Sequence, residues 1–418
     1  MKIVIIGGGA SGIISSIRLK QLIPNSEVII LERLEKIGKK ILATGNGKCN
    51  FTNINVDNKK YNNPKFVKPT LDIYNSEKLI KYLEELGLYS KELTEGRIYP
   101  YTEQAATFLE VLRMNLNKYQ IKVESNFEVA KIEKKKDEFI IHHKSKRAFS
   151  INADIVILAT GGKSAEILGS NGSGYNLAKN LKIKTTDVKA GLVGLIGDSN
   201  QLKSLNGLRY KCNVSLFDKK EKQVKWCEYG EVQFKNDGIS GIVVMELSSF
   251  AANYKGNYLV QLDLIKEKTL NEVKEMLLKR QTDFGDCEIF NYLTGILPKA
   301  LAQSILKKAN IDLSIYIKDL NTRSINKIAA LIKQYPIEIK GDYGFDKSQI
   351  TIGGVELSEI NPLTMEAKKV ENLYIVGELL NINGRCGGYN LHWALASGLI
   401  AAEAIKERMD NNVRNKKS

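Results

Sequence analysis

The sequence predicts an α/β fold whose nucleotide-binding part is interrupted by an inserted domain of strands followed by helices. Apolar runs at 2–6 and 27–31 flank a helical segment and predict a strand–helix–strand unit. Between residues 187 and 335 the spacing of apolar residues changes from alternating to helical, and glycine-ended strands return after it. The predicted boundaries are a nucleotide-binding domain at 1–186, an inserted β-plus-α domain at 187–344 and a second nucleotide-binding part at 345–418.

The strongest signal is a glycine-rich turn after the first strand. Gly7, Gly9 and Gly12 have the spacing G-x-G-x-x-G. In such a turn the first glycine allows the bend, the second lets the backbone approach a pyrophosphate, and the third lets the helix pack closely on the strand. Glu32 lies 20 residues after Gly12, where an acid hydrogen-bonds an adenosine ribose and repels a 2′-phosphate. The turn therefore predicts FAD or NAD rather than NADP, and the alternative is a glycine turn without a ligand.

Composition is that of an ordinary globular protein of two or three domains. The chain has 418 residues, 43% of them hydrophobic and 26% charged. It contains no run of 18 apolar residues, and its N-terminal strand leaves no room for a signal peptide. Five scattered cysteines without a C-x-x-C pair favour a reducing compartment, and three histidines do not suggest a histidine-rich metal site. We therefore expect a cytoplasmic protein with no membrane contact and no bound metal.

The net charge of +15 has two interpretations. Lysines number 51 and arginines 11, against 47 acidic residues. The excess can reflect a general preference for Lys, Asn and Ile, with the lysines solvated over the whole surface. It can also attract a polyanion, of which RNA is the first candidate. Net charge bears on association rather than on fold, so the sequence leaves both interpretations open.

Capping and periodicity predict the other elements of the first domain. The glycine-, Asn- and Lys-rich segment 33–53 predicts an extended loop along a cofactor, with an ordinary surface loop as the alternative. Ser76 can cap a helix over 77–86, a second helix follows Thr102, and residues 97–101 predict an aromatic turn. Strands are predicted at 121–123, 127–132, 139–143, 148–151 and 154–158.

The inserted domain and the C-terminal part follow the same rules. In the inserted domain, strands are predicted at 213–217, 224–227, 230–234 and 258–262, and helices within 268–335. No catalytic constellation is visible there. In the C-terminal part, the strand 372–376 runs into Gly377-Glu378, and a glycine turn then precedes a helix over 391–405. This repeat of strand, glycine turn and helix predicts a second site for a phosphate or a flavin ring edge.

Three features together carry a family resemblance: Gly7–Gly12 with Glu32, Ala159-Thr160-Gly161, and Gly377-Glu378 with its glycine turn and helix. They resemble the Rossmann-like FAD-binding domain of the glutathione-reductase type, interrupted here by an inserted β-plus-α domain. More narrowly, Leu42–Asn53 and Gly387–Asn390 resemble the BaiN/RdsA-type NAD(P)/FAD-dependent oxidoreductases, which include aminoacetone oxidase-like, bile-acid-reducing and rRNA dihydrouridine synthase-like members. The resemblance spans nearly the whole chain and implies an FAD-dependent oxidoreductase.

The resemblance also implies a set of cofactor contacts. Glu378 stands where an Asp is more usual after the glycine, and its extra methylene changes its reach toward a ribityl hydroxyl. The predicted FAD-binding residues are Gly7, Gly9, Ala10, Ser11, Gly12, Glu32, Arg33, Lys40, Thr44, Asn46, Gly47, Val129, Thr160, Gly161, Gly354, Gly377, Glu378, Gly388, Tyr389, Asn390 and Leu391.

Reduction of a C=C bond conjugated to a carbonyl also needs a proton donor beside the flavin. Cys49, Cys386 and Tyr389 are the candidate catalytic residues, and the alternative for the cysteines is that they pack the glycine-rich loops. Family and charge together favour a uridine of 23S ribosomal RNA as substrate, giving dihydrouridine, with NAD(P)H as electron donor and a Lys-rich surface contacting the RNA. The alternatives are a small-molecule flavin enzyme acting on amines or enones and a non-catalytic, flavin-bearing RNA-binding protein.

Overall fold

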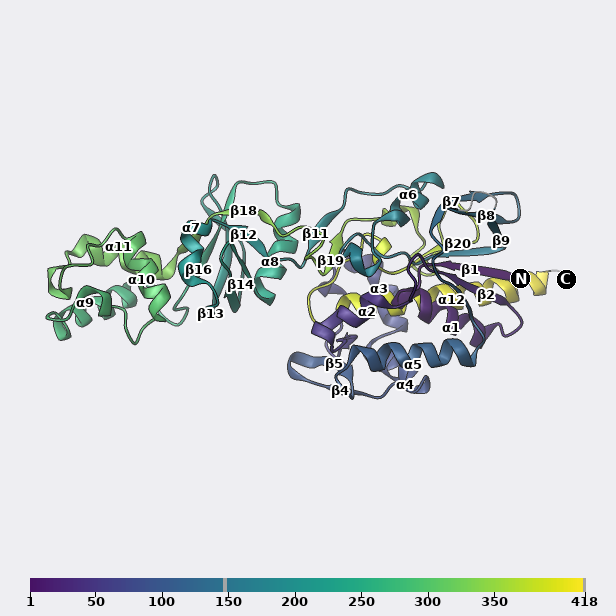
Figure 1. Cartoon of the computed structure of the whole chain (residues 1–418), viewed down its shortest axis with the longest axis horizontal. Helices are drawn as coiled ribbons and strands as arrows, with labels where there is room; N and C mark the ends of the chain where they lie inside the picture. The colour runs from purple at the N-terminus through teal and green to yellow at the C-terminus, as the bar shows by residue number, and fades with distance from the viewer. Residues whose placement is uncertain (146–148, 416–418) are drawn as a thin grey trace. The chain divides into compact units, whose positions relative to one another are not determined.

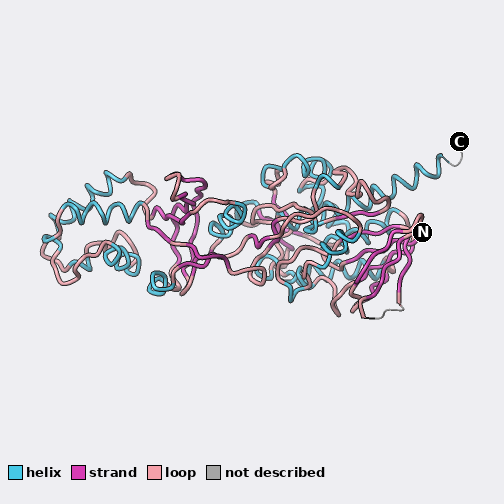
Figure 2. Tube along the Cα trace, turned by 90° about the horizontal axis from the view of Figure 1, so that it is seen from above, coloured by secondary structure: helices cyan, strands magenta, loops and turns pink. Residues whose placement is uncertain are grey.

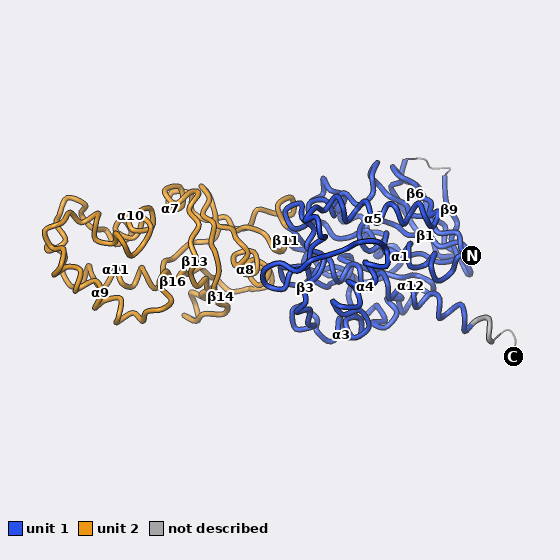
Figure 3. The backbone as a smooth tube through the Cα atoms, turned by 90° about the horizontal axis from the view of Figure 1, so that it is seen from below, with its two compact units in different colours: residues 1–189, 349–418 blue, residues 190–348 orange. Residues whose placement is uncertain are grey.

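The computed structural model describes residues 1–145 and 149–415, so Ala148, where one predicted strand begins, lies outside the described residues. The chain divides into two compact units (Figure 3). Unit 1 comprises residues 1–189 and 349–418, and unit 2 comprises residues 190–348. The chain passes into unit 2 through β11 (Lys189–Gly191) and returns through β19 (Ile350–Ile352).

The centre of unit 1 is a five-stranded parallel sheet. Its order is β20 (Leu373–Ile375), β10 (Ile155–Leu158), β1 (Lys2–Ile6), β2 (Glu27–Leu31) and β6 (Lys122–Glu124). In β1, Ile5 lies opposite Ile157 on one side and Ile30 on the other, and all three are fully buried. Such near-continuous β-branched runs are typical of strands covered on both faces.

Two layers cover this sheet. Helices α1 (Ala10–Leu22), α5 (Ala105–Lys118) and α12 (Tyr389–Asn415) lie on one side, with α1 packed against both others. An antiparallel sheet of β7 (Val129–Lys134), β8 (Phe139–His143) and β9 (Ser150–Ala153) lies on the other side (Figure 1). The helices α2 (Lys39–Ala43), α3 (Pro64–Ile73), α4 (Ser76–Glu85) and α6 (Ser173–Asn180) and the small sheet β3 (Thr52–Asn53), β5 (Arg97–Pro100) and β4 (Ser90–Glu92) complete the unit. None of the helices in the described part of the chain is long and apolar enough to cross a membrane.

Unit 2 combines an antiparallel sheet with helices, which Figure 2 shows beside its strands. The sheet order is β17 (Tyr335–Ile337), β16 (Tyr258–Asp263), β13 (Arg209–Asp218), β14 (Gln223–Phe234), β15 (Gly238–Ser240), β12 (Leu195–Gly197) and β18 (Ile339–Asp342). The helices are α7 (Ser199–Leu202), α8 (Ile242–Asn253), α9 (Leu270–Asp283), α10 (Lys299–Lys308) and α11 (Thr322–Lys333). A single apolar cluster joins the strands to the helices.

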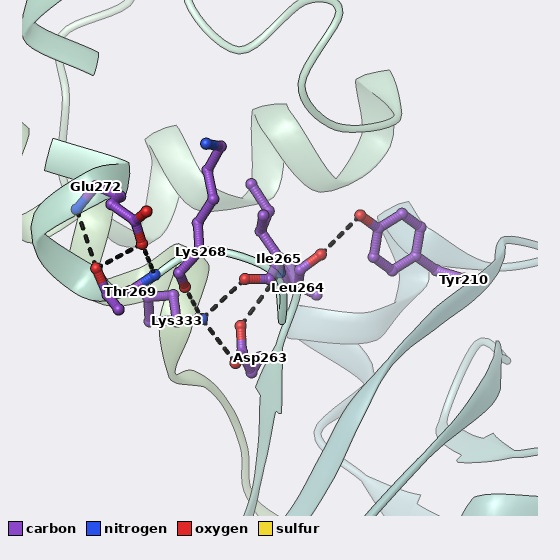
Figure 4. A network of polar contacts seen from close by, with 8 residues as sticks. All are labelled: Tyr210, Asp263, Leu264, Ile265, Lys268, Thr269, Glu272 and Lys333. Atoms are coloured by element: carbon purple, nitrogen blue, oxygen red, sulfur yellow. Dashed lines mark hydrogen bonds and ion pairs between the residues drawn. The ribbon is translucent and has the colours of Figure 1, made fainter. Parts of the chain in front are cut away.

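A polar network fixes the helices of unit 2 to the end of the sheet (Figure 4). The ammonium Nζ of Lys333, at the end of α11, lies 2.7 Å from Asp263 Oδ2 and donates to the carbonyl oxygens of Ile265 (2.8 Å) and Lys268 (2.5 Å). The next residue, Thr269, caps α9. One lysine therefore holds together the end of β16, the turn after it and the end of α11.

Several predicted elements of unit 1 are wrong in detail. Segment 33–53 is not an extended loop: it contains α2 and a tight 3₁₀ turn at Thr44–Gly47, in which Asn46 has a left-handed φ of 55°. Asn75, not Ser76, caps α4, because its side chain accepts from Lys78 N at 2.9 Å. Residues 97–100 form strand β5 rather than a turn, and α3 was not predicted.

The strands predicted in unit 2 also need correction. The runs 224–227 and 230–234 belong to one continuous strand, β14, and Gly230 lies within this strand rather than in a turn between two strands. Helix α8 lies where only strands were expected. Its β-branched start, Ile242, Val243 and Val244, favours a strand locally, but packing of α8 against β13 and β14 overrides that preference.

Candidate functional site

A cavity opens at the carboxyl ends of the parallel strands of unit 1, the usual ligand position in an open α/β sheet. Gly7 follows β1, Glu32 follows β2, Ala159 follows β10 and Glu378 follows β20, and all four line it. Its empty space is about 990 Å³, part of it open to solvent. Segments from both ends of the sequence therefore line a single cavity.

The first part of the wall is the turn from β1 into α1. Gly7 has a φ of +111°, and a Cβ placed there would lie 2.4 Å from the carbonyl oxygen of Ala159. A Cβ on Gly12 would lie 2.1 Å from the carbonyl oxygen of Gly7. Gly9 differs, because no atom lies within 4 Å of a Cβ built on it, and that space faces the cavity. Two glycines thus let the helix dock on the sheet, while the third keeps room for a ligand.

The N-terminal end of α1 presents N–H donors to this open space. The N–H groups of Ala10 and Ser11 belong to the first turn of α1 and have no carbonyl of the preceding turn to bond. No acidic side chain lies in this turn. Free N–H groups at the positive end of a helix bind phosphates.

Glu32 is held in a fixed orientation in the cavity wall. Its Oε2 accepts from Gly8 N at 2.8 Å, and its Oε1 accepts from Leu34 N at 2.8 Å. Each carboxylate oxygen keeps a second lone pair for a sugar hydroxyl. The neighbouring Arg33 donates from Nη2 to Gly169 O at 3.3 Å, while its buried Nε has no partner among the described residues. This arrangement suits the ribose of an adenosine group.

An ion pair also forms part of the wall. Lys40 Nζ and Glu378 Oε2 are 2.8 Å apart, and Glu378 Oε1 accepts from Thr351 N at 2.8 Å. Helix α2 brings Lys40 there because Gly38, at a left-handed φ of 72°, donates its N–H to Gly8 O. Both side chains of the pair are about a quarter exposed, so they are reachable from the cavity. Near them, the buried hydroxyl of Thr160 has no partner in the described part of the chain.

The turn before α12 is locked by its own side chains. Asn390 accepts from Gly384 N at 2.8 Å and donates to Gly384 O at 2.8 Å and Arg385 O at 3.2 Å. Gly377, after β20, donates to Ser397 Oγ at 3.0 Å and accepts from Trp393 Nε1 at 3.2 Å. These bonds place the start of α12 against the cavity.

His392, in the first turn of α12, joins three segments behind the cavity wall. Its Nδ1 lies 2.8 Å from Thr52 Oγ1, and its Nε2 lies 2.9 Å from the carbonyl oxygen of Tyr74. Complete burial lowers the pKa of His392 to about 4. The ring is therefore neutral at pH 7, donating to Tyr74 and accepting from Thr52. Sequence reasoning gave His392 no role, since both partners are more than 300 residues away.

The structure brings twelve of the predicted FAD-binding residues to the cavity wall. These are Gly7, Gly9, Ala10, Ser11, Glu32, Lys40, Thr44, Thr160, Gly161, Glu378, Asn390 and Leu391. The other nine do not line it: Gly12, Arg33, Asn46, Gly47, Val129, Gly354, Gly377, Gly388 and Tyr389. Several of these lie directly behind the wall, as Gly12 and Gly377 do.

The wall also contains residues that the motifs did not indicate. Leu34, Lys36, Ile41, Ser170, Gln349 and Trp393 line the cavity. Leu34 and Lys36 could have been found, since they follow Glu32 in the predicted cofactor loop, and so could Trp393, which follows Asn390 and Leu391 in α12. No local signal marks Ser170 or Gln349, which the fold brings in from two other segments.

The three candidate catalytic residues lie in different environments. Cys49 is fully buried, and burial raises the pKa of its thiol to about 12. Tyr389 is 7% exposed, with its ring edge-on to Tyr61 at 6.1 Å between centroids. Cys386 is partly exposed, in the loop between the wall residues Ile382 and Asn390. None of the three is among the described residues that line the cavity, and its raised pKa makes Cys49 a weak proton donor.

Comparison with known proteins identifies the family. The family described as HI0933-like protein Rossmann domain matches residues 1–404. The chain belongs to this family. It is 36% identical over 414 residues to a 3-dehydro-bile acid delta(4,6)-reductase of Clostridium scindens, covering 97% of this chain and 99% of the relative.

More distant members carry another name. Ribosomal RNA dihydrouridine synthases of Haemophilus influenzae and Escherichia coli are 28% and 27% identical, over 97% and 96% of this chain and 98% and 97% of theirs. Among solved structures, a flavocytochrome c3 fumarate reductase matches with a TM-score of 0.47 and 15% identity, over 97% of this chain and 78% of that one. The HI0933-like chain is an FAD-dependent oxidoreductase with the FAD-binding fold that its motifs predicted.

The residues of the cavity fit FAD. The free N–H groups at α1 suit its pyrophosphate, and the oriented Glu32 carboxylate suits its adenosine ribose. Lys40, Glu378 and the Thr160 hydroxyl, which has no partner among the described residues, offer polar atoms to the flavin half. The open space above Gly9 gives the backbone the close approach that a dinucleotide needs.

Proposed function

We propose that this HI0933-like protein reduces a carbon–carbon double bond conjugated to a carbonyl, with a uridine of 23S ribosomal RNA as its substrate and dihydrouridine as the product. The observation that carries the proposal is the cavity described above, built for FAD by both ends of the chain. NAD(P)H is the proposed electron donor.

The reaction requires two electrons and two protons in balance. FAD, when bound, supplies two-electron hydride chemistry between a nicotinamide and the substrate carbon β to the carbonyl. The carbon α to the carbonyl takes a proton, which the protein must deliver. Cys386 is the proposed donor, because it is the partly exposed one of the three candidates and lies in the loop before α12. The Lys40–Glu378 pair supplies a positioned ammonium and carboxylate beside the reacting groups.

Two observations support the RNA substrate. The first is the name of the relatives from Haemophilus influenzae and Escherichia coli. The second is the distribution of charge: unit 1 holds 39 Lys and Arg against 28 Asp and Glu, and unit 2 holds 23 against 19. Most of the excess positive charge therefore belongs to the unit that contains the cavity. A polyanion is drawn to such a surface.

A small enone is the second candidate substrate. The relative from Clostridium scindens supports it, because its identity of 36% is higher than that of the two RNA-named relatives. The chemistry is the same in both cases, the saturation of a double bond conjugated to a carbonyl. The two candidates differ in what must bind beside the cavity.

The test is anaerobic reduction of the purified yellow protein by NADPH or NADH, followed by addition of rRNA or of a small steroid enone. The proposal predicts bleaching of the flavin absorbance by a nicotinamide and its recovery with rRNA. Recovery with the enone alone would support the second candidate. A flavin that neither nicotinamide reduces would contradict the proposed donor and favour a non-catalytic role in RNA binding.

A further inference from the structure

One face of the sheet in unit 2 carries polar and apolar side chains that line a groove. Strands β14, β13 and β16 lie side by side, and their paired residues form rows across this face. The rows are Tyr229–Asn213–Asp263, Cys227–Ser215–Gln261 and Val224–Phe217–Leu259. The opposite face carries Val214 and Leu216, which are fully buried in the apolar cluster of unit 2.

A groove runs over this face toward α9 and α11. Asn213, Ser215 and Gln261 line it from the sheet, and Gln334 lines it from the end of α11. Its empty space is about 790 Å³, part of it open to solvent. These four side chains have no hydrogen-bond partner among the described residues. Three amides and a hydroxyl with unused donors and acceptors can bond the edges of nucleobases.

An aromatic ring and two unpaired cations adjoin the groove. Tyr229 is 48% exposed, and Lys266 Nζ lies 3.5 Å from the centre of its ring. Within the described residues, neither Lys266 nor Lys211, two positions from Asn213 on β13, has a carboxylate partner. The face has two acids, Asp263 and Glu231, and each has a basic partner: Lys333 lies 2.7 Å from Asp263, and Arg209 lies 3.7 Å from Glu231, the residue opposite Lys211. The face is therefore positively charged, with an exposed ring on which a base can stack.

We propose that this face, named here the β13 platform (Lys211, Asn213, Ser215, Tyr229, Gln261, Lys266 and Gln334), binds a single-stranded segment of RNA. A base stacks on Tyr229, the amides of Asn213, Gln261 and Gln334 contact base edges, and Lys211 and Lys266 contact phosphates. Exposed sheet faces with aromatic residues are a recurring way of binding single strands. The inference rests on the proposed RNA substrate and adds to it the surface that holds the strand outside the flavin cavity.

The test measures binding of a fluorescent single-stranded RNA to the full-length holoenzyme by anisotropy at several salt concentrations. Tyr229→Ala should weaken binding about tenfold, since one stacked base is lost. Lys266→Gln should lower the slope of log K against log salt by about 0.7, the value for one phosphate contact with a single strand. Tyr316→Ala is the matched control, because Tyr316 is 49% exposed in the same unit with Lys318 near its ring, but lies outside the platform. This control should bind RNA like the wild type.

The possible results separate the two proposals. Wild-type affinity in both Tyr229→Ala and Lys266→Gln, with RNA still bound and reduced by the enzyme, would overturn the platform and leave the proposed function standing. Weakened binding in these two variants together with a wild-type enzyme that never reduces RNA would support the platform and overturn the proposed reaction. A wild-type protein that does not bind the RNA would overturn both.

Discussion

The glycine turn of α1 allows ligand binding to be separated from folding. Gly9 has a φ of −86°, which alanine adopts without strain, and a Cβ there meets no protein atom within 4 Å. Gly12 is different, because a Cβ there would lie 2.1 Å from a backbone oxygen. We therefore expect Gly9→Ala to lose FAD while its apoprotein stays as stable as the wild type, and Gly12→Ala to lose both FAD affinity and stability.

The magnitudes follow from the same contacts. A methyl group on Gly9 would keep a phosphate oxygen roughly 3.5 Å from its carbon atom. This would push the oxygen beyond hydrogen-bonding distance of the N–H groups of Ala10 and Ser11. Loss of two charge-assisted bonds costs about 3 kcal/mol, or roughly two orders of magnitude in FAD affinity. In Gly12→Ala, moving α1 off the sheet costs about 1–3 kcal/mol of stability, and the apoprotein melting temperature should fall by about 5 °C.

The assay is a titration of each apoprotein with FAD, followed by flavin fluorescence, with circular dichroism melting of the same apoproteins. The two variants serve as controls for each other, since both add one methyl group to the same turn. Wild-type FAD affinity in Gly9→Ala would refute the placement of the pyrophosphate at α1. Equal melting losses in the two variants would refute the distinction between the ligand-facing and the sheet-facing glycine.

Three further predictions concern single side chains. Burial lowers the pKa of His392 from 6.5 to about 4, so between these pH values the unfolded chain binds a proton that the folded chain does not. The unfolding free energy should therefore fall with falling pH in this window, by up to about 1.4 kcal/mol per pH unit. His392→Gln should lose this slope in urea titrations. Lys333→Met should lower the unfolding free energy by about 2 kcal/mol, because Asp263 and two carbonyls lose their donor. Lys327→Met, at an exposed position of the same helix, is the control and should change it little. Equal effects of the two substitutions in urea titrations would contradict the network. Cys386→Ala should slow flavin reoxidation by substrate at least about 100-fold with FAD affinity intact, and an unchanged rate in stopped-flow measurements would exclude this thiol as the proton donor.

The sequence was informative where local chemistry determines structure. Strands β1 and β2 begin and end at the predicted residues, and Glu32 reaches the cavity, because a buried strand and a glycine turn are both local patterns. Helix α8 was missed because packing on β13 and β14, the strands that precede it, overrides the strand preference of its first residues. Similarly, Ser170 and Gln349 reach the cavity only through the fold. Cys49 is fully buried, as the packing alternative for this cysteine predicts.

A single-turnover experiment tests most directly the proposed reduction of uridine in ribosomal RNA by this HI0933-like protein. The holoenzyme is reduced without oxygen by one equivalent of NADPH and mixed with 23S rRNA that lacks dihydrouridine. Flavin oxidation is followed by absorbance, and dihydrouridine is then counted by mass spectrometry of the digested RNA. We expect one dihydrouridine for each flavin oxidised. Flavin that stays reduced in the presence of the RNA, or that is oxidised without formation of dihydrouridine, would contradict it.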